Sequence, residues 1–166
     1  QRVGNSESGH IAVKHGNPNI VYSGKPPHGG DYLLRYDRDE DQVRVISPWP
    51  EFNWGTGVKH HKYRFQWTFP IVSSRHDPSL LYVAANVVLK SENEGSSWTE
   101  ISPDLTRKDI TKMGTPGGPI TGDHTGPEHY GTIFSFAESP IDPAIFWAGS
   151  DDGLVHVSTD GAETWV

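Results

Sequence analysis

The sequence contains no cysteine and no long apolar run. With Cys 0, it can form neither disulfides nor thiolate-bound metal sites. No apolar stretch approaches the roughly 20 residues with which a helix crosses a bilayer. Positive charge is also scarce, because 14 Lys and Arg stand against 21 Asp and Glu for a net charge of −7. A nucleic-acid groove needs a basic patch, so we expect neither a nucleic-acid partner nor a membrane span.

Helical periodicity is missing as well. No segment keeps apolar residues at helical spacing over several turns. The chain is rich instead in residues that form turns and in large rings, with 18 Gly, 13 Pro and 6 Trp. Short apolar stretches separated by Gly and Pro are typical of β-strands joined by turns. The sequence therefore predicts an all-β chain.

One short pattern occurs three times, at offsets of 60 and 65 residues. Each copy reads Asn or Asp, Pro, any residue, two apolar residues and an aromatic ring. The copies are Asn17–Tyr22, Asp77–Tyr82 and Asp142–Trp147. Proline fixes its own φ, and the Asn or Asp before it can accept a hydrogen bond from the backbone two residues on. Each copy therefore predicts a tight turn that leads into a strand.

The repeats predict a particular architecture. Apolar positions precede each turn, and further strand-like stretches follow it at 32–36, 42–46, 87–90, 98–101 and 154–157. Four short antiparallel strands repeated in tandem are typical of β-propeller blades. We predict one partial propeller domain over 1–166. Its parts are blade 1 at about 9–47, blade 2 at about 63–102, an insert loop at 103–129, and an incomplete blade 3 at about 130–166.

Propellers have about four to eight blades, and a lone blade leaves its faces uncovered. We therefore expect the remaining blades of a longer parent chain, or other chains, to complete the ring. The start of the sequence, Gln1-Arg-Val-Gly, is typical of the middle of a chain and contains no secretory signal.

Two loops end in a tryptophan and resemble the Asp-box, Ser-x-Asp-x-Gly-x-Thr-Trp. The second loop has Ala162 in place of the glycine, and the first has Asn93 in place of the aspartate. An Asp or Asn side chain can bond amides of its own loop, and tryptophan supplies a large apolar body for burial. We therefore assign the matching residues a structural role. They are Ser91, Asn93, Gly95 and Trp98 in one loop, and Ser158, Asp160, Thr164 and Trp165 in the other.

Longer blocks resemble large bacterial Asp-box (BNR-repeat) propeller proteins, which are labelled glycosyl hydrolase or sortilin (Vps10)-like. The blocks lie at 62–71, 101–107, 117–121, 131–134, 137–140 and 147–157. The resemblance covers nearly the whole chain. It implies a much longer parent protein that is exported to the bacterial periplasm, to the cell surface or out of the cell. The label carries no single reaction, so the resemblance implies a fold more than an activity.

The densest polar cluster lies at 123–130, in the insert loop. It supplies Asp123 and Glu128 as candidate catalytic carboxylates, because a glycoside hydrolase needs two carboxylates that face each other across the bond. His124 and His129 are candidate ligand-binding residues beside them. The alternative interpretation is that all four are turn and cap residues of a solvated loop.

Two tryptophans of the connector between blades 1 and 2, Trp49 and Trp54, are candidate stacking surfaces for a sugar or a peptide. Such rings are equally what a propeller core buries. We predict no cofactor and no metal ligands, with calcium held by loop carboxylates as the alternative.

These observations leave three functions open. We expect a glycan- or protein-binding or scaffold region of a larger exported propeller protein. The alternative is part of a glycoside hydrolase acting on polysaccharide, with catalytic carboxylates partly outside this chain, so enzymatic activity stays open. A peptide-sorting role of the sortilin kind is the third, and no residue here supports it.

Overall fold

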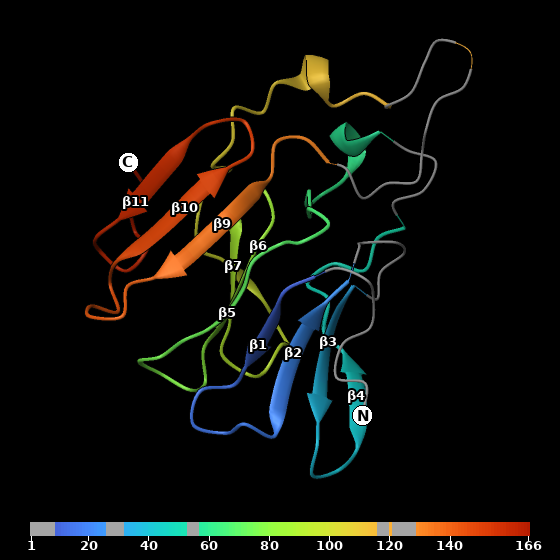
Figure 1. The fold of residues 1–166 in the computed structure, drawn as a ribbon. Coiled ribbons are helices and arrows are strands. Elements are labelled where there is room, and N and C mark those ends of the chain that lie inside the picture. The colour runs from blue at the N-terminus through green and yellow to red at the C-terminus, as the bar shows by residue number, and fades with distance from the viewer. Residues whose placement is uncertain (1–8, 26–31, 53–56, 116–119, 121–128) are drawn as a thin grey trace.

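The chain folds into three antiparallel sheets that lie side by side (Figure 1). The computed structural model describes residues 9–25, 32–52, 57–115, 120 and 129–166. In every sheet the strands follow one another in chain order, so each sheet is a simple meander. The sheets contain four, four and three strands, and we name them blades 1, 2 and 3. The predicted all-β partial propeller with an incomplete third blade is confirmed.

The strands are short. Blade 1 comprises β1 (Ile11–Val13), β2 (Ile20–Gly24), β3 (Leu33–Asp37) and β4 (Gln42–Val45). Blade 2 comprises β5 (Ile71–Ser73), β6 (Leu81–Ala84), β7 (Val88–Ser91) and β8 (Thr99–Glu100). Blade 3 comprises β9 (Ile133–Glu138), β10 (Phe146–Ser150) and β11 (Val155–Ser158). Helix in the described residues is limited to two single turns of 3-10 helix, η1 (Val58–His60) and η2 (Ile110–Lys112).

The first strands of the three blades are neighbours. β5 of blade 2 contacts β1 of blade 1 on one side and β9 of blade 3 on the other. The three blades are therefore arranged with their first strands side by side, as the first strands of blades are arranged around the axis of a propeller.

Blade 2 is buried on both faces. On β6, Leu81 and Val83 pack into the core shared with blade 1, whereas Tyr82 packs into the core shared with blade 3. Successive side chains of a strand point to opposite faces. A strand that lies between two blades is therefore apolar at every position, which explains why the sequence here does not alternate with polar residues.

The repeated turn forms as the sequence predicts. In each copy the side-chain oxygen of the residue before proline accepts a hydrogen bond from the amide two residues later. The N–O distance is 3.1 Å at Asn17, 2.8 Å at Asp77 and 2.9 Å at Asp142. This bond fixes the direction in which the second strand of each blade begins.

The two loops that end in tryptophan have matching internal hydrogen bonds. The hydroxyl of Ser91 accepts the Gly95 amide at 2.8 Å, and the hydroxyl of Ser158 accepts the Ala162 amide at 2.9 Å. Likewise, Asn93 Oδ1 accepts the Ser97 amide at 2.8 Å and Asp160 Oδ1 accepts the Thr164 amide at 3.0 Å. The loop serine and the loop Asn or Asp therefore each fix a different amide.

Each loop tryptophan also reaches the preceding blade. The indole of Trp98 donates to the Ile46 carbonyl at 2.9 Å, and the indole of Trp165 donates to the Ile101 carbonyl at 3.1 Å. Ile46 and Ile101 both follow the last strand of their own blade. The same bond therefore joins blade 2 to blade 1 and blade 3 to blade 2.

The segment before blade 2 differs from the expectation. The predicted blade began near residue 63, but β5 begins at Ile71, directly after Pro70. Proline has no amide to donate to a sheet, which fits the late start of this strand. Phe65 and Phe69 are nevertheless buried, where they join Tyr32 in an aromatic group of the core.

Candidate functional site

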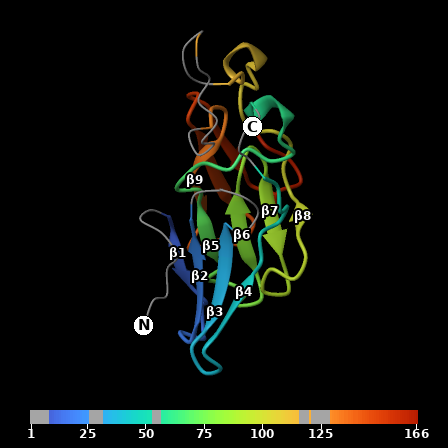
Figure 2. The same cartoon turned by 90° about the vertical axis from the view of Figure 1, so that its right-hand side faces the viewer.

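The long connectors lie at one end of the sheets. The described parts of the connector between β4 and β5 carry η1, and those of the connector between β8 and β9 carry η2. Both views place the two helical turns at this end, which we name the connector end (Figures 1 and 2). The loops that end in tryptophan join the strands at the opposite end, because each follows the third strand of its blade.

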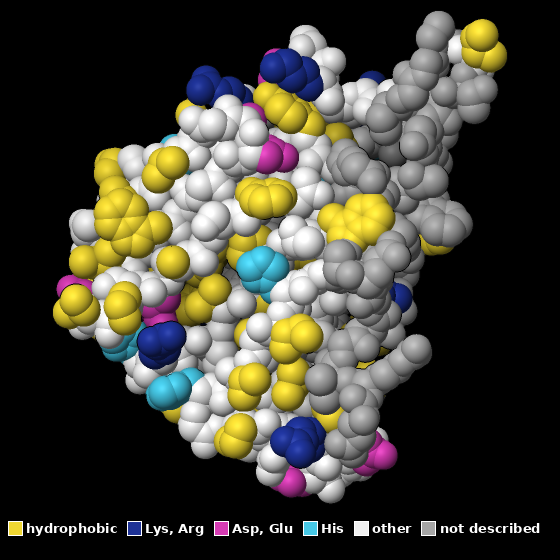
Figure 3. Space-filling model, in the orientation of Figure 1, with side chains coloured by type: hydrophobic (Ala, Val, Ile, Leu, Met, Phe, Trp, Pro, Cys, Tyr) yellow, Lys and Arg dark blue, Asp and Glu magenta, His cyan; other side chains and the backbone are white. Residues whose placement is uncertain are grey.

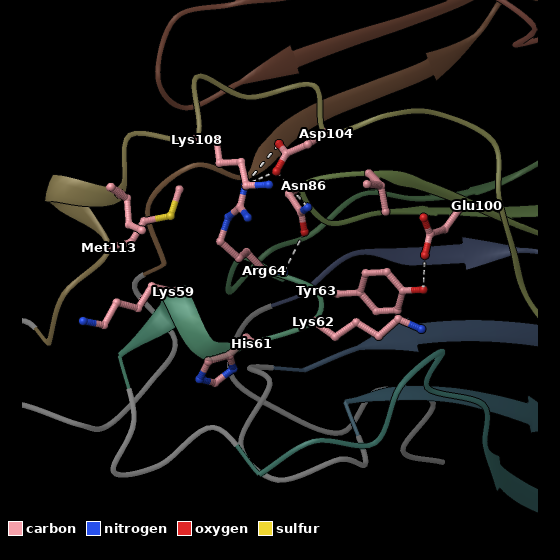
Figure 4. A pocket seen from close by; sticks show the side chains of 12 residues that line it. Lys59, His61, Lys62, Tyr63, Arg64, Asn86, Glu100, Asp104, Lys108 and Met113 are labelled. Carbon is pink, nitrogen blue, oxygen red and sulfur yellow. Dashed lines mark hydrogen bonds and ion pairs between the residues drawn. The ribbon is translucent and has the colours of Figure 1, made fainter.

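A pocket with a volume of about 570 Å³ opens at the connector end beside blade 2 (Figure 4). Its walls come from both connectors, the β6–β7 turn and β8. The lining residues are Lys59, His61, Lys62, Tyr63, Arg64, Asn86, Val87, Glu100, Asp104, Lys108, Ile110 and Met113. The pocket therefore combines charged, amide and aromatic groups.

Arg64 is the centre of the pocket floor, and only 5% of it is exposed. Its guanidinium donates to Asp104 Oδ2 at 2.8 Å and to the Gly131 carbonyl at 2.9 Å. Its backbone amide donates to Asn86 Oδ1, also at 2.9 Å. One side chain and its own backbone thus join the first connector, the second connector and the β6–β7 turn.

Asp104 receives further hydrogen bonds. Its Oδ1 accepts from the Thr106 amide at 3.1 Å and from the Thr106 hydroxyl at 2.7 Å. Burial raises the pKa of Asp104, but the bonds from Thr106 and the charge of Arg64 outweigh that effect and lower it. The carboxylate therefore stays ionised and paired, which suits a structural anchor and excludes it as a proton donor near neutral pH.

Lys62 and Tyr63 line one side of the pocket, and Trp49 contacts Lys62 outside the lining. The hydroxyl of Tyr63 donates to Glu100 Oε1 at 2.7 Å. Burial, and then the bond to Glu100, raise the pKa of Tyr63, so the hydroxyl stays protonated. The Lys62 ammonium lies 4.1 Å from the centre of the Trp49 ring and 4.8 Å from that of Tyr63. The predicted stacking residue Trp49 is 45% exposed, with Lys62 over its face.

His129 lies in the interior rather than at a surface. It is 7% exposed, and its ring centre is 5.4 Å from that of buried His61, a lining residue of the pocket. Burial, and then the charge interaction with nearby His61, lower the pKa of His129 to about 4. The other predicted residues of this kind, Trp54, Asp123, His124 and Glu128, lie outside the described residues.

The insert is anchored to blade 3 by two adjacent aspartates. Asp151 Oδ1 accepts the amides of Gly131 and Thr132, both at 3.0 Å. Asp152 Oδ2 accepts the Arg107 amide at 2.7 Å. Nothing in the spacing of this pair in the sequence shows that it holds a distant loop.

Sequence reasoning missed most of the pocket. Two of the resembling blocks, 62–71 and 101–107, contain Arg64 and Asp104, but these residues are 40 positions apart. A resemblance marks both blocks without showing that they meet. Among the described residues, no three His, Cys, Asp or Glu side chains are grouped so that they could hold a metal ion. The helical turns that were found are too short to cross a membrane.

Comparisons with known proteins agree with the fold. A GH74 xyloglucanase from Xanthomonas campestris aligns over 95% of this chain with a TM-score of 0.59 and 18% sequence identity. The chain is part of a β-propeller. It spans 20% of the length of that xyloglucanase. YCF48 from Cyanidioschyzon merolae aligns over 94% of this chain and 35% of its own, with a TM-score of 0.46 and 14% identity. No protein-family model and no curated protein matches the sequence.

Proposed function

We propose that this chain is a glycan-binding region of a larger exported propeller protein, and that the pocket at the connector end is its binding surface. The observation that carries the proposal is the pocket itself. Its volume of about 570 Å³ lies within the range of small-ligand sites, roughly 300–1,000 Å³. Loops held by a rigid scaffold are also where proteins commonly place binding residues.

The pocket is built to keep its shape. The ion pair between Arg64 and Asp104, at 2.8 Å, joins the two connectors within the pocket lining itself. Side chains held by packing and hydrogen bonds lose less freedom when a ligand binds, and this favours affinity. Tyr63 supplies ring surface at one side of the pocket, and Glu100 supplies an acceptor for sugar hydroxyl groups. The xyloglucanase among the solved structures of similar fold also favours a glycan over other ligands.

A hydrolytic role has less support from the described pocket. The usual mechanism needs one carboxylic acid that donates a proton and a second carboxylate opposite it. Of the two carboxylates that line the pocket, Asp104 is ionised and paired with Arg64. Glu100 is then a single carboxylate where the mechanism needs two. Asp123 and Glu128 stay proposals as a catalytic pair.

The exposed face of blade 3 supports completion of the ring by further blades. Tyr22, Tyr82 and Trp147 occupy the same place in the three repeats. Tyr22 and Tyr82 are 2% and 3% exposed because the next blade covers them, whereas Trp147 is 50% exposed. Hydrophobic side chains gather over this blade, at the left of Figure 3. We propose that another blade of the parent chain covers this face.

A glycan array tests the proposed function, with the full-length protein as the probe. We expect binding to at least one polysaccharide class and a loss of about tenfold in affinity in Tyr63→Ala. Glu40→Ala, in the exposed β3–β4 turn of blade 1 and outside the pocket lining, is the control and should bind as the wild type does. Absence of binding across the panel, or equal binding by Tyr63→Ala, would contradict the proposal. Release of reducing sugar by the same protein would favour the hydrolase instead.

A further inference from the structure

We infer that the ligand of this pocket is an acidic glycan, and that Lys59, Lys62 and Lys108 bind its carboxylate or sulfate groups. This inference rests on the proposed function and adds the charge of the ligand to it. Lys59 and Lys62 come from the first connector and Lys108 from the second, and the three lie on different sides of the pocket (Figure 4).

The charge of the pocket is opposite to that of the chain. Four cationic side chains and two carboxylates line it, although the net charge of the protein is −7. Arg64 and Asp104 neutralise each other at 2.8 Å, and Glu100 accepts the hydroxyl of Tyr63. None of the three lysines forms an ion pair with another described residue. Such a concave positive site attracts anions.

Lys62 is held in place without an anionic partner. Its ammonium group lies over two rings, 4.1 Å from the centre of Trp49 and 4.8 Å from that of Tyr63. Its backbone amide donates to Glu51 Oε2 at 3.2 Å. Cation–π contacts fix the position of an ammonium group but leave its three N–H donors available. The ring face attracts the positive charge without accepting a directed hydrogen bond.

The backbone at Lys108 is strained. Its φ is 51°, in the left-handed region that residues other than glycine rarely adopt. The surroundings hold this conformation, because the Lys108 amide donates to the Thr106 hydroxyl at 3.2 Å and the preceding Arg107 is bound by Asp152. Strained residues cluster at ligand sites, where the fold maintains a conformation that local preference opposes. At Lys108 this conformation places a third ammonium group beside the pocket.

A glycan fits this site better than an acidic peptide. Glu100 lies in the same pocket as the lysines, and one of its oxygens is free of the Tyr63 bond. This oxygen can accept a hydrogen bond from a sugar hydroxyl, which a run of Asp and Glu side chains does not offer. Anionic groups that alternate with hydroxyls match a pocket with lysines on several sides and a hydrogen-bond acceptor.

Titration calorimetry on the full-length protein tests the inference with three probes: oligogalacturonate, chondroitin sulfate oligosaccharides and neutral xyloglucan oligosaccharides. We expect one of the acidic probes to bind about tenfold more tightly than the neutral one, with an affinity that falls as salt rises. Lys62→Gln and Lys108→Asn should each weaken that binding about tenfold. Asparagine tolerates a positive φ, so Lys108→Asn removes the charge and keeps the backbone conformation. Lys90→Gln, outside the pocket, is the matched control.

The outcomes separate the inference from the proposed function. Tighter binding of the carboxylated or the sulfated probe, sensitive to both lysine variants, supports the inference and identifies the anionic group. Binding of the neutral probe alone overturns the inference and leaves the proposed function standing. Acidic-probe binding that neither variant weakens overturns the assignment of the site. Absence of binding by all three probes, together with an empty glycan array, overturns both.

Discussion

Buried His129 should make the protein less stable in mild acid. Its side chain is 7% exposed and lies against His61, and burial lowers its pKa from 6.5 to about 4. Between these two values an unfolded chain takes up a proton that the folded protein does not. The neutral ring therefore contributes its full stability above about pH 6.5, and this contribution falls as the pH decreases toward about 4.

The size of the effect follows from the two pKa values. One pKa unit corresponds to about 1.4 kcal/mol, so the shift to about 4 amounts to about 3 kcal/mol once the pH is below both values. At about pH 5 the unfolded imidazole is largely charged and the folded one largely neutral, and about 2 kcal/mol of that total is already lost.

Urea unfolding of the full-length protein at about pH 7.5 and about pH 5 measures this loss. We expect His129→Gln to lose about 2 kcal/mol less than the wild type does between these pH values, because glutamine takes up no proton. His60→Gln replaces an exposed neighbour of His61 and should behave as the wild type does. Equal losses in the wild type and His129→Gln would refute the reasoning.

Three further predictions concern packing. Arg64→Ala leaves Asp104 as a largely buried charge without its ion-pair partner. We expect this variant to be roughly 3–5 kcal/mol less stable in urea unfolding. A loss below about 1 kcal/mol would contradict the anchor role. Ala162→Gly should raise the free energy of unfolding by about 1 kcal/mol, because φ is 75° at this position. Gly95→Ala should lower it, because the added methyl group would lie 2.6 Å from Ile46. Thermal melts test this pair, and we expect shifts of opposite sign. Trp147→Ser should destabilise the full-length protein by roughly 3 kcal/mol in urea unfolding if another blade covers this ring, and hardly at all if solvent does.

The sequence predicts the fold well because the repeat is local. The hydrogen bond at each Asn-Pro or Asp-Pro turn joins residues two positions apart, so its geometry follows from the residues themselves. The same holds inside the loops that end in tryptophan, where each bond spans four positions. Because each blade packs on the next in the same way, the repeat extends this local information to all three blades.

The site could not be predicted in the same way. Arg64 and Asp104 meet because the two connectors turn toward each other, and no period in the sequence encodes such a path. The burial of His129 is a second example. A polar residue in a loop is usually solvated, but this one lies under the first connector beside His61. The strain at Lys108 is likewise invisible before the backbone is known.

Two kinds of bond hold the blades and the connectors, and this separates stability from binding. The indoles of Trp98 and Trp165 bind carbonyls of the preceding blade, and these bonds recur from blade to blade. At the connector end, the ion pair of Arg64 with Asp104 occurs once and depends on the particular connectors. Trp98→Phe should therefore cost about 1 kcal/mol of stability and leave ligand affinity unchanged, whereas a change at Arg64 should reduce both. An equal loss of affinity in the two variants, measured by calorimetry on the full-length protein, would show that the inter-blade bonds and the ion pair are coupled.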